Sequence, residues 1–339
     1  MEKLSKIVCL TFDYELFLKE TGTVENCLIK PTNALLDLFF RRKIRGTFFI
    51  DALYLNKIRY HNELLNDYKK VKQQLLRIIR EGSRIELHLH PQWLSSDYKN
   101  GKWTFVELKK YYRLQNLTKE DVYASFKTGK DVLEDIAREV DSNYNIQAFR
   151  AGGYCISPFD KLKKPFLDLG LKIDSSIAPG LKYNSEFQDY DFRKVPTAPY
   201  YFTESPLSAD PRGKIMEIPI SVYKKFIYER VYEKLPHIKK PDKTIFGDGE
   251  GLIPKLGKDK NYFFHFLRKF NPLQFVLSLD NTSLHTFKKQ LDRSESQIIN
   301  VLSHPKLLSK TSLEIVRDLP DKNTDYLDIV SLYETIKIS

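Results

Sequence analysis

The first 180 residues alternate short apolar runs with longer stretches in which apolar residues recur every three to four positions. The short runs predict β-strands, and the helical spacing predicts amphipathic helices between them. Strands are expected at about 7–16, 46–55, 84–90, 146–154 and 171–179, and helices at about 31–43, 66–82, 118–139 and 158–170. Repeated strand–helix units imply parallel strands joined by right-handed crossovers. The pattern therefore predicts an α/β fold, either a barrel or a doubly wound sheet.

This alternation breaks down between about 181 and 280, where Tyr, Phe, Pro and Lys accumulate and the strand expected at 214–221 stands alone. Regular structure returns with a helix near 283–293, a strand near 297–306 and a helix from about 311. No stretch of the chain has the composition of a clean linker between domains. We therefore expect a single barrel domain over residues 1–339 with an elaborated insertion at about 181–280.

The chain carries 55 Lys and Arg residues against 44 Asp and Glu residues, a net charge of +11 over 339 residues. The basic residues are dispersed rather than gathered in one stripe, which favours a solvated surface over a nucleic-acid site. The alternative is an anionic partner of another kind, namely a phosphate-bearing substrate or a membrane surface. We expect no nucleic-acid partner.

Three cysteines, Cys9, Cys27 and Cys155, have neither metal-binding nor redox spacing, and their odd number argues against a disulfide framework. The apolar run at the N-terminus meets Asp13 after a few residues and is too short for a signal-peptide core. No stretch is long and apolar enough to span a bilayer. These features predict a cytoplasmic protein in a reducing compartment.

Two histidines, His88 and His90, are separated by one residue in a segment with strand character. Because a strand repeats every two residues, both imidazoles leave one face while Leu87 and Leu89 leave the other. Pro91 ends the strand, which places the pair at its carboxyl end. Such a pair suits a metal such as zinc; the alternative is a solvent-facing pair on a half-buried strand.

Polar residues also follow the other predicted strands at the edge where α/β folds build their sites. They are Asp13, Glu15, Arg150, Tyr154, Asp174 and His304, in addition to the two histidines. Each one alone has an ordinary structural explanation, such as a helix cap or a surface ion pair. Together they indicate a metal site accompanied by a general acid and a general base.

The same segments resemble the motifs of the polysaccharide deacetylase (NodB-homology) family of carbohydrate esterases, in the family's order. The matching stretches are LTFDYE, GTFFI, REGSRIELHLHP, FRAGGY, IDSS and VLSHP. The His-x-His-Pro stretch is most similar to the intracellular branch associated with O-antigen and capsule biosynthesis. The resemblance implies a distorted (β/α)7 barrel that hydrolyses the amide of N-acetyl sugars with a divalent metal.

By position, the resemblance makes Asp13 the general base, and Glu15, His88 and His90 the ligands of the metal, for which zinc is expected. This chain departs from the family pattern in two places. Glu15 is separated from Asp13 by one residue, where the family has adjacent aspartates. The family's histidines stand four apart, and that spacing would place Gln92, a poor ligand, in the set.

The resemblance also assigns the remaining residues. Arg150 would orient Asp13, and the backbone N–H of Tyr154 would help to hold the oxyanion. Asp174 would tune His304, the general acid. A carboxylate beside an imidazole favours its protonated form, so the last pairing also suits the chemistry.

Three other functions fit parts of the pattern. A His-x-His pair opens the amidohydrolase barrels, although there it lies on the first strand. A catalytically inactive carbohydrate-binding barrel would keep the fold without turnover. A deformylase of lipid-linked amino sugars would keep the chemistry and change the acyl group.

A cytoplasmic enzyme would act on a biosynthetic intermediate, either a nucleotide sugar or a glycan on a lipid phosphate. Basic residues in the 181–280 region would attract the phosphate, and peripheral contact with a membrane surface is a related possibility. The aromatic residues there would either stack on sugar rings or pack the region onto the barrel. The residues concerned are Lys224, Lys225, Lys239, Lys240, Tyr200, Tyr201, Phe202, Phe263 and Phe264.

Overall fold

A computed structural model of the chain describes residues 5–226, 228–229, 242, 244–251, 273–294 and 296–338. Its centre is a nine-stranded sheet with the order β10-β11-β7-β6-β3-β2-β1-β14, in which β15 also pairs with β1. Neighbouring strands of this sheet run parallel, except β10 and β11, which are antiparallel. In sheet order the strands are Tyr200–Phe202, Ile215–Glu217, Ile173–Asp174, Ala148–Ala151, Arg84–Leu89, Gly46–Asp51, Lys6–Tyr14, Ile298–Ser303 and, for β15, Thr324–Tyr326.

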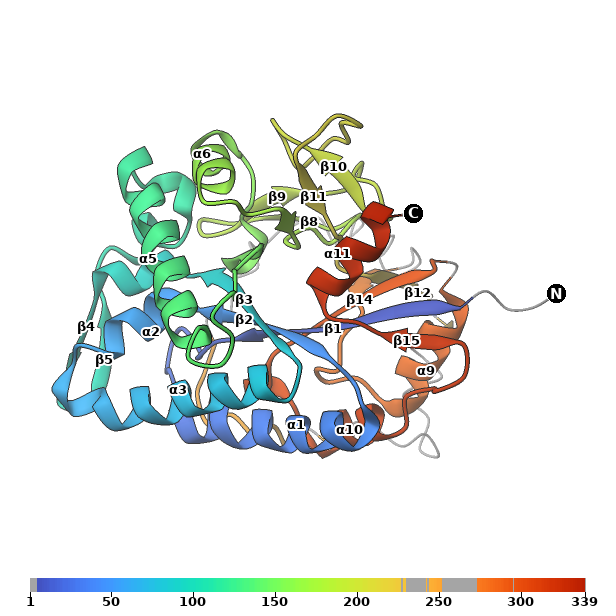
Figure 1. Cartoon of the computed structure of the whole chain (residues 1–339), viewed down its shortest axis with the longest axis horizontal. Coiled ribbons are helices and arrows are strands. Elements are labelled where there is room, and N and C mark those ends of the chain that lie inside the picture. Colours follow the sequence, from blue (N-terminus) through green and yellow to red (C-terminus); the bar gives the residue numbers. More distant parts are fainter. Residues whose placement is uncertain are drawn as a thin grey trace.

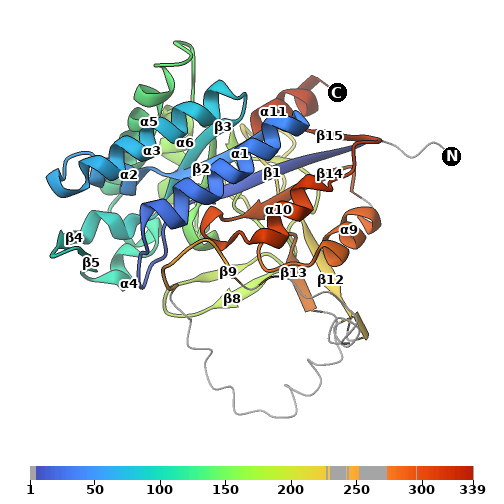
Figure 2. The same cartoon turned by 90° about the horizontal axis from the view of Figure 1, so that it is seen from below.

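Helices pack around this sheet, which curls into a partial barrel (Figure 1). Figure 2 shows α1, α3 and α10 side by side on one face. The longer helices are α1 (Lys30–Arg42), α2 (Ala52–Ile58), α3 (Leu65–Arg80), α5 (Lys119–Ala137), α6 (Asp160–Asp168), α9 (Leu284–Arg293), α10 (Lys310–Arg317) and α11 (Ile329–Ile338). The helices expected from apolar spacing in the first 180 residues and near 283–293 and 311 are thus confirmed.

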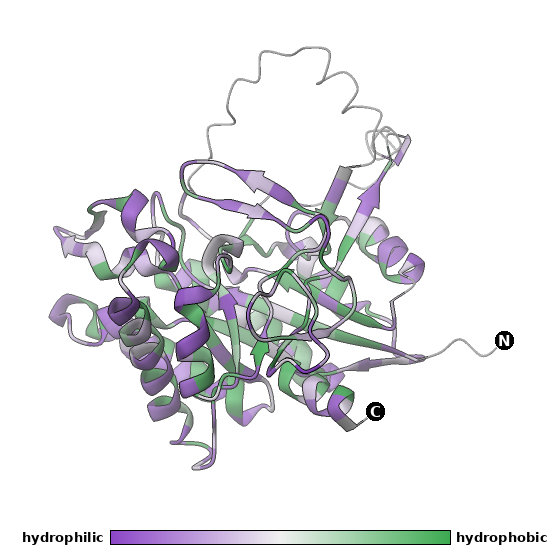
Figure 3. Cartoon of the chain, turned by 90° about the horizontal axis from the view of Figure 1, so that it is seen from above, coloured by the Kyte–Doolittle hydropathy of each residue, from purple (hydrophilic) through white to green (hydrophobic). Residues whose placement is uncertain are grey.

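Strand alternation divides the sheet into two chemically different faces. On β1, Val8, Leu10 and Phe12 belong to the large core beneath the surrounding helices, whereas Cys9 packs on the opposite face with residues of α11. Figure 3 shows hydrophobic residues (green) along the central strands and hydrophilic residues (purple) over the outer helices. The concave face therefore has an apolar plug at its base, and the polar residues of β1 come after it along the strand.

The middle of the concave face is a buried hydrogen-bonded layer. Arg150 Nη2 donates to Thr11 Oγ1 and to Ser175 Oγ, both at 2.9 Å. Asn300 Nδ2 donates to the same Ser175 oxygen at 2.9 Å, and Thr11 Oγ1 donates to Asn300 Oδ1 at 3.1 Å. Buried polar groups are stable only when their hydrogen bonds are made, so this layer fixes the depth and direction of Arg150.

The region expected as an insertion contributes to the main sheet as well as to the surface. β11, which the sequence suggested as an isolated strand, pairs in parallel with β7. Outside the sheet, the described residues form three two-stranded ribbons: β4 (Ser96–Lys99) with β5 (Lys102–Phe105), β8 (Lys182–Asn184) with β9 (Asp189–Asp191), and β12 (Val222–Lys225) with β13 (Leu273–Val276). The described residues also contain short helical segments: η1 (Glu25–Ile29), η2 (Asn62–Leu64), η3 (Pro91–Ser95), α4 (Leu108–Tyr111), η4 (Leu114–Asn116), η5 (Gly152–Tyr154) and η6 (Pro305–Leu307). In the part of the chain that the structure describes, no helix is long and apolar enough to cross a membrane.

Candidate active site

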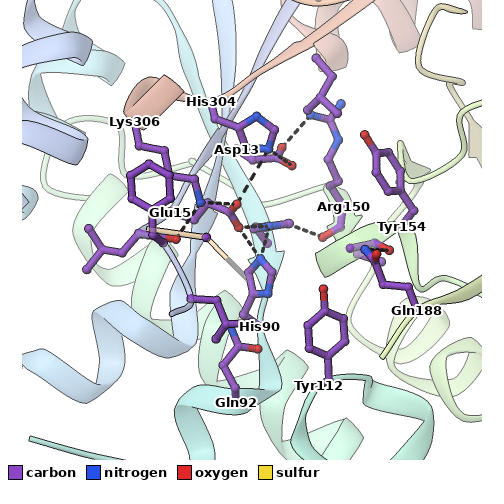
Figure 4. A pocket seen from close by; sticks show the side chains of 18 residues that line it. Asp13, Glu15, His90, Gln92, Tyr112, Arg150, Tyr154, Gln188, His304 and Lys306 are labelled. Atoms are coloured by element: carbon purple, nitrogen blue, oxygen red, sulfur yellow. Dashed lines mark hydrogen bonds and ion pairs between the residues drawn. The ribbon is translucent and has the colours of Figure 1, made fainter. Parts of the chain in front are cut away.

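A cavity of about 260 Å³ opens where the parallel strands end. Asp13 and Glu15 reach it from the end of β1, His88 and His90 from β3, and Arg150 from β6. The remaining wall comes from loops and short helical segments and carries Gln92, Tyr112, Tyr154, Gln188, His304 and Lys306 (Figure 4). The sequence-predicted cluster at the carboxyl ends of the strands is therefore one site, except for Asp174.

Glu15, His88 and His90 form a group able to hold a metal ion, with one ligand atom of each residue within 4.8 Å of the others. His88 Nε2 lies 3.0 Å from Glu15 Oε2 and 3.0 Å from His90 Nε2. His90 Nε2 also contacts Glu15 Oε2. Two imidazole nitrogens and one carboxylate oxygen form a ligand set that leaves coordination positions open in catalytic zinc sites.

Partners outside this group set the direction of the two imidazoles. His88 Nδ1 donates a hydrogen bond to the carbonyl oxygen of Arg150 at 2.7 Å, which leaves Nε2 as its acceptor nitrogen. A Cβ at Gly152 would lie 2.7 Å from the ring of His90, so glycine at this position allows that ring to take its place. Such partners fix the tautomer and the orientation of metal-binding histidines.

Lys306 is a cation beside the Glu15–His88–His90 group. The sequence pattern did not indicate it. Its Nζ donates to Glu15 Oε1 at 2.8 Å and to the carbonyl oxygen of Leu16 at 2.7 Å. Burial acts to raise the pKa of Glu15, but Lys306, His90 and His88 together hold that pKa well below its ordinary value. Glu15 is therefore ionised and presents Oε2 to the histidines. Burial acts to lower the pKa of His90, but the charge of Glu15 raises it to about 9.

Asp13 and Arg150 form a buried ion pair next to this group. Arg150 Nη1 donates to Asp13 Oδ1 at 2.8 Å, and only 2% of the arginine and 6% of the aspartate are exposed. Arg150 Nε donates to the carbonyl oxygen of Ser175 at 2.7 Å, and the guanidinium lies 4.1 Å from the ring centroid of Phe49. The arginine thus leaves one oxygen of Asp13, Oδ2, directed toward the cavity.

His304 completes the site from the end of β14. Its Nε2 lies 3.8 Å from both Asp13 Oδ2 and Glu15 Oε1. Its Nδ1 donates to Asp280 Oδ2 at 2.7 Å, while Asp280 Oδ1 accepts the backbone N–H of His304 at 3.2 Å. Burial acts to lower the pKa of His304, but Asp280, Asp13 and Glu15 outweigh it and raise the pKa. His304 is accordingly suited to carry a proton.

The pairing of Asp174 with His304 expected from the sequence is wrong: the carboxylate on His304 is Asp280. Asp174 pairs in register with Phe149 and Glu217 on the neighbouring strands, and Phe149 belongs to the core beneath the helices. Strand alternation therefore turns Asp174 away from the concave face, toward which Ser175 points. Asp174 Oδ1 accepts a hydrogen bond from Ser176 at 2.6 Å, and its carboxyl group shares a second one with Glu217.

Tyr154 lies on the cavity wall, in a backbone turn where its φ is 62°. A non-glycine residue at positive φ is uncommon and often marks a functional turn. Burial raises the pKa of the Tyr154 hydroxyl, so it stays protonated. The expected use of its backbone N–H for an oxyanion stays a prediction.

Four residues of the site, Lys306, Asp280, Tyr112 and Gln188, were missed by sequence reasoning. Two of them had a usable signal: Lys306 follows the predicted His304-Pro305 pair directly, and Asp280 ends an apolar run before a helix start. Tyr112 and Gln188 lie in loops without such a pattern. Their place in the cavity depends on long-range folding of both loops.

The basic and aromatic residues proposed for substrate binding divide into three groups. Lys239, Lys240, Phe263 and Phe264 lie outside the described residues. Tyr200 and Phe202 are buried in the core, and Tyr201 is half-buried, which fits packing rather than stacking on sugars. Lys224 is exposed and Lys225 is half-buried.

No protein-family model matches the chain, and no curated protein matches its sequence. Among solved structures, a protein described as a polysaccharide deacetylase from Mycobacterium smegmatis is similar to this chain, with a TM-score of 0.51 and 12% identity over 100% of this chain and 92% of that one. The 4-alpha-glucanotransferase of Thermococcus litoralis gives a TM-score of 0.51 and 12% identity over 98% of this chain and 40% of that one. Likeness at this level establishes a shared fold, while the reaction must be argued from the site. The distorted α/β barrel expected from the sequence is confirmed as the fold of this chain.

Proposed function

We propose that the protein is a metal-dependent hydrolase that removes the N-acetyl group from an amino sugar in a glycan intermediate of cell-surface polysaccharide biosynthesis. The observation that carries this proposal is the meeting of three units in one cavity: the Glu15–His88–His90 group, the Asp13–Arg150 pair and the His304–Asp280 pair. Each unit supplies one requirement of amide hydrolysis, a reaction with a poor electrophile and a poor leaving group.

The Glu15–His88–His90 group fits a divalent cation, and zinc suits its nitrogen and oxygen donors best. A bound zinc ion would supply a Lewis acid that polarises the acyl carbonyl and acidifies water. Lys306 Nζ binds Oε1 of Glu15 and leaves Oε2 as the oxygen that faces the histidines.

Asp13 and His304 are placed for the proton transfers. Asp13 Oδ2 would accept the proton of the attacking water, since Oδ1 is occupied by Arg150. His304 would give a proton from Nε2 to the departing nitrogen, because Asp280 holds Nδ1 and favours the charged ring. The water oxygen bonds to the acyl carbon, the C–N bond breaks, and acetate and the free amine leave. A positioned acid or base of this kind contributes about 10²–10⁴-fold to the rate.

A phosphate-linked amino sugar is the substrate class that the charge favours. The chain has a net charge of +11, and Lys224 is exposed on β12. Such charge attracts anions over about one Debye length, roughly 8 Å at physiological salt. The same charge is compatible with transient contact with an anionic membrane surface that carries a lipid-linked glycan.

The test is acyl release by the zinc-loaded protein from UDP-N-acetylglucosamine and, for comparison, from neutral chitotetraose. We expect acetate release that a chelator abolishes and zinc restores, with preference for the phosphate-linked sugar. Release that ignores the chelator, or no release from either substrate class, would overturn the proposal. Formate release from N-formyl sugars with none from N-acetyl sugars would instead favour a deformylase, since the site places the same groups around either acyl carbon.

A further inference from the structure

Gln92 is a buried amide in the cavity wall that the proposed reaction does not use. It follows His90 and Pro91 in the short helix η3, and only 3% of it is exposed. Its backbone carbonyl accepts a hydrogen bond from Ser95 Oγ at 3.2 Å. Its side-chain oxygen Oε1 has no hydrogen-bond partner among the residues that the structure describes.

An unpaired acceptor of this kind is unfavourable, because the group loses its hydrogen bonds to water and gains none in the fold. An apolar side chain of similar size, such as methionine, would fill the same space without this loss. The amide therefore points to a ligand that carries a hydrogen-bond donor.

The position of Gln92 identifies which part of the substrate it meets. Figure 4 shows Gln92 and Tyr112 on the opposite side of the Glu15–His88–His90 group from His304. Since His304 gives its proton to the departing nitrogen, the sugar lies on the His304 side of the scissile bond. The acyl group then extends in the other direction, toward Gln92 and Tyr112.

Tyr112 adds a second polar group to this side of the cavity. Its ring packs against Phe187 at a centroid distance of 5.2 Å, which joins the loop before α5 to the β8–β9 turn. Burial raises the pKa of the Tyr112 hydroxyl, so the group keeps its proton. The acyl side of the cavity thus offers an acceptor and a hydroxyl in addition to its apolar contacts.

We propose that Gln92, with Tyr112 beside it, forms the subsite for the acyl group and that this subsite selects a small acyl group bearing a hydroxyl, such as N-glycolyl. This inference rests on the proposed function and refines its acyl specificity. Hydrolysis of such an amide breaks the same C–N bond and releases a hydroxycarboxylate and the amine.

The experiment measures how tightly the product carboxylate binds to the Co²⁺-loaded protein. Binding is detected as a change in the visible absorption of the cobalt. Glycolate and propionate form a matched pair, since they differ by a hydroxyl in place of a methyl group. In the native protein we expect glycolate to bind about tenfold more tightly than propionate, the effect of one hydrogen bond to an otherwise unpaired group. Gln92→Met should abolish this preference and leave the affinity for formate, which has no substituent, unchanged.

The controls separate this inference from the proposed function. Gln73→Met changes an exposed glutamine and should behave as the native protein does. Gln92→Asn, which withdraws the amide by one methylene, replaces Gln92→Met if that variant fails to fold and should also lose the preference. Glycolate preference that persists in the Gln92 variant would reflect chelation by glycolate alone and overturn the inference, as would equal native affinities. A native protein that binds no Co²⁺ overturns the proposed function and this inference together.

Discussion

Two sets of buried or half-buried carboxyl groups lie in this barrel and are stabilised in opposite ways. In the cavity and directly behind it, each carboxylate has a cationic or imidazole partner: Arg150 for Asp13, Lys306 for Glu15 and His304 for Asp280. On the other face of the sheet, Asp174 and Glu217 stand in register on β7 and β11. Asp174 Oδ2 and Glu217 Oε2 have no partner among the other described residues, and the two carboxyl groups share a hydrogen bond with each other.

The second pair is held together by a proton. Burial raises the pKa of Asp174 to about 6, and burial together with the charge of Asp174 raises the pKa of Glu217 well above its ordinary value. Glu217 is therefore protonated and donates to Asp174. Carboxyl groups of the same kind are thus stabilised by a cation on one face of the sheet and by a shared proton on the other. The face of the strand decides between these outcomes.

The largest expected effect is that of Asp13→Asn on turnover. The amide cannot take the proton of water, so we expect the deacylation rate to fall about 10²–10⁴-fold. Zinc affinity should remain close to that of the native protein, because the ligand atoms belong to Glu15, His88 and His90. Steady-state rates and a zinc titration measure the two quantities.

The matched control for that variant is Asp174→Asn, the same exchange on the other face of the sheet. It should leave turnover per folded molecule nearly unchanged. If Asp174→Asn reduces turnover as strongly as Asp13→Asn, the division of roles between the two faces is wrong. If Asp13→Asn releases the zinc, Asp13 is itself a ligand.

A smaller effect is expected from Asp280→Asn, which removes the charge that holds His304. Misorientation of the acid should reduce the rate about 10- to 100-fold. Because Asp280 raises the pKa of His304, the variant should lower it, and the alkaline limb of the rate profile should move to lower pH. An NMR titration of the His304 ring checks the shift. An unchanged His304 pKa in Asp280→Asn, with a lowered one in Asp174→Asn, would restore the pairing that the sequence suggested.

The smallest effect concerns stability and its dependence on pH. A carboxyl group with a raised pKa binds its proton more tightly in the folded state than in the unfolded state. The free energy of unfolding therefore falls as pH rises from the unfolded pKa, about 4, through the raised folded values. Glu217→Gln keeps a donor for Asp174 without an ionisable proton and should flatten this fall above pH 4.

Urea unfolding of the native protein and of Glu217→Gln between pH 4 and pH 8 measures that difference. Glu217→Ala provides the comparison, because it leaves Asp174 buried without its donor and should destabilise the fold by about 1–3 kcal/mol at pH 7. If the free energy of unfolding depends on pH in the same way in the native protein and in Glu217→Gln, the two carboxyl groups do not share a proton.

The sequence predicted the parts of this molecule that depend on local periodicity. Strand–helix alternation gave the curled parallel sheet, and the residues after β1, β3 and β14 came together because parallel strands end at one edge. It could not supply partners from irregular segments. Asp280 reaches His304 from the loop after β13, and no periodicity links positions 280 and 304.

The pairing of Asp174 with His304 came from the family resemblance, and the sequence pattern of β7 could not correct it. β7 has only two residues in the sheet, Ile173 and Asp174, so its alternation was too short to read from the sequence. Ser175, the next residue, points to the concave face and contacts Arg150. Neighbouring residues of a strand point to opposite faces, so Asp174 lies on the outer face while Ser175 lies on the inner one.

The central claim is that Glu15, His88 and His90 hold a single divalent metal. Its most direct test is an anomalous-difference map, collected at the zinc absorption edge, from crystals of the zinc-loaded protein. The account predicts one strong peak bonded to Glu15 Oε2, His88 Nε2 and His90 Nε2, at about 2 Å from each atom. No peak among these three side chains, or a peak held by other residues, would contradict it.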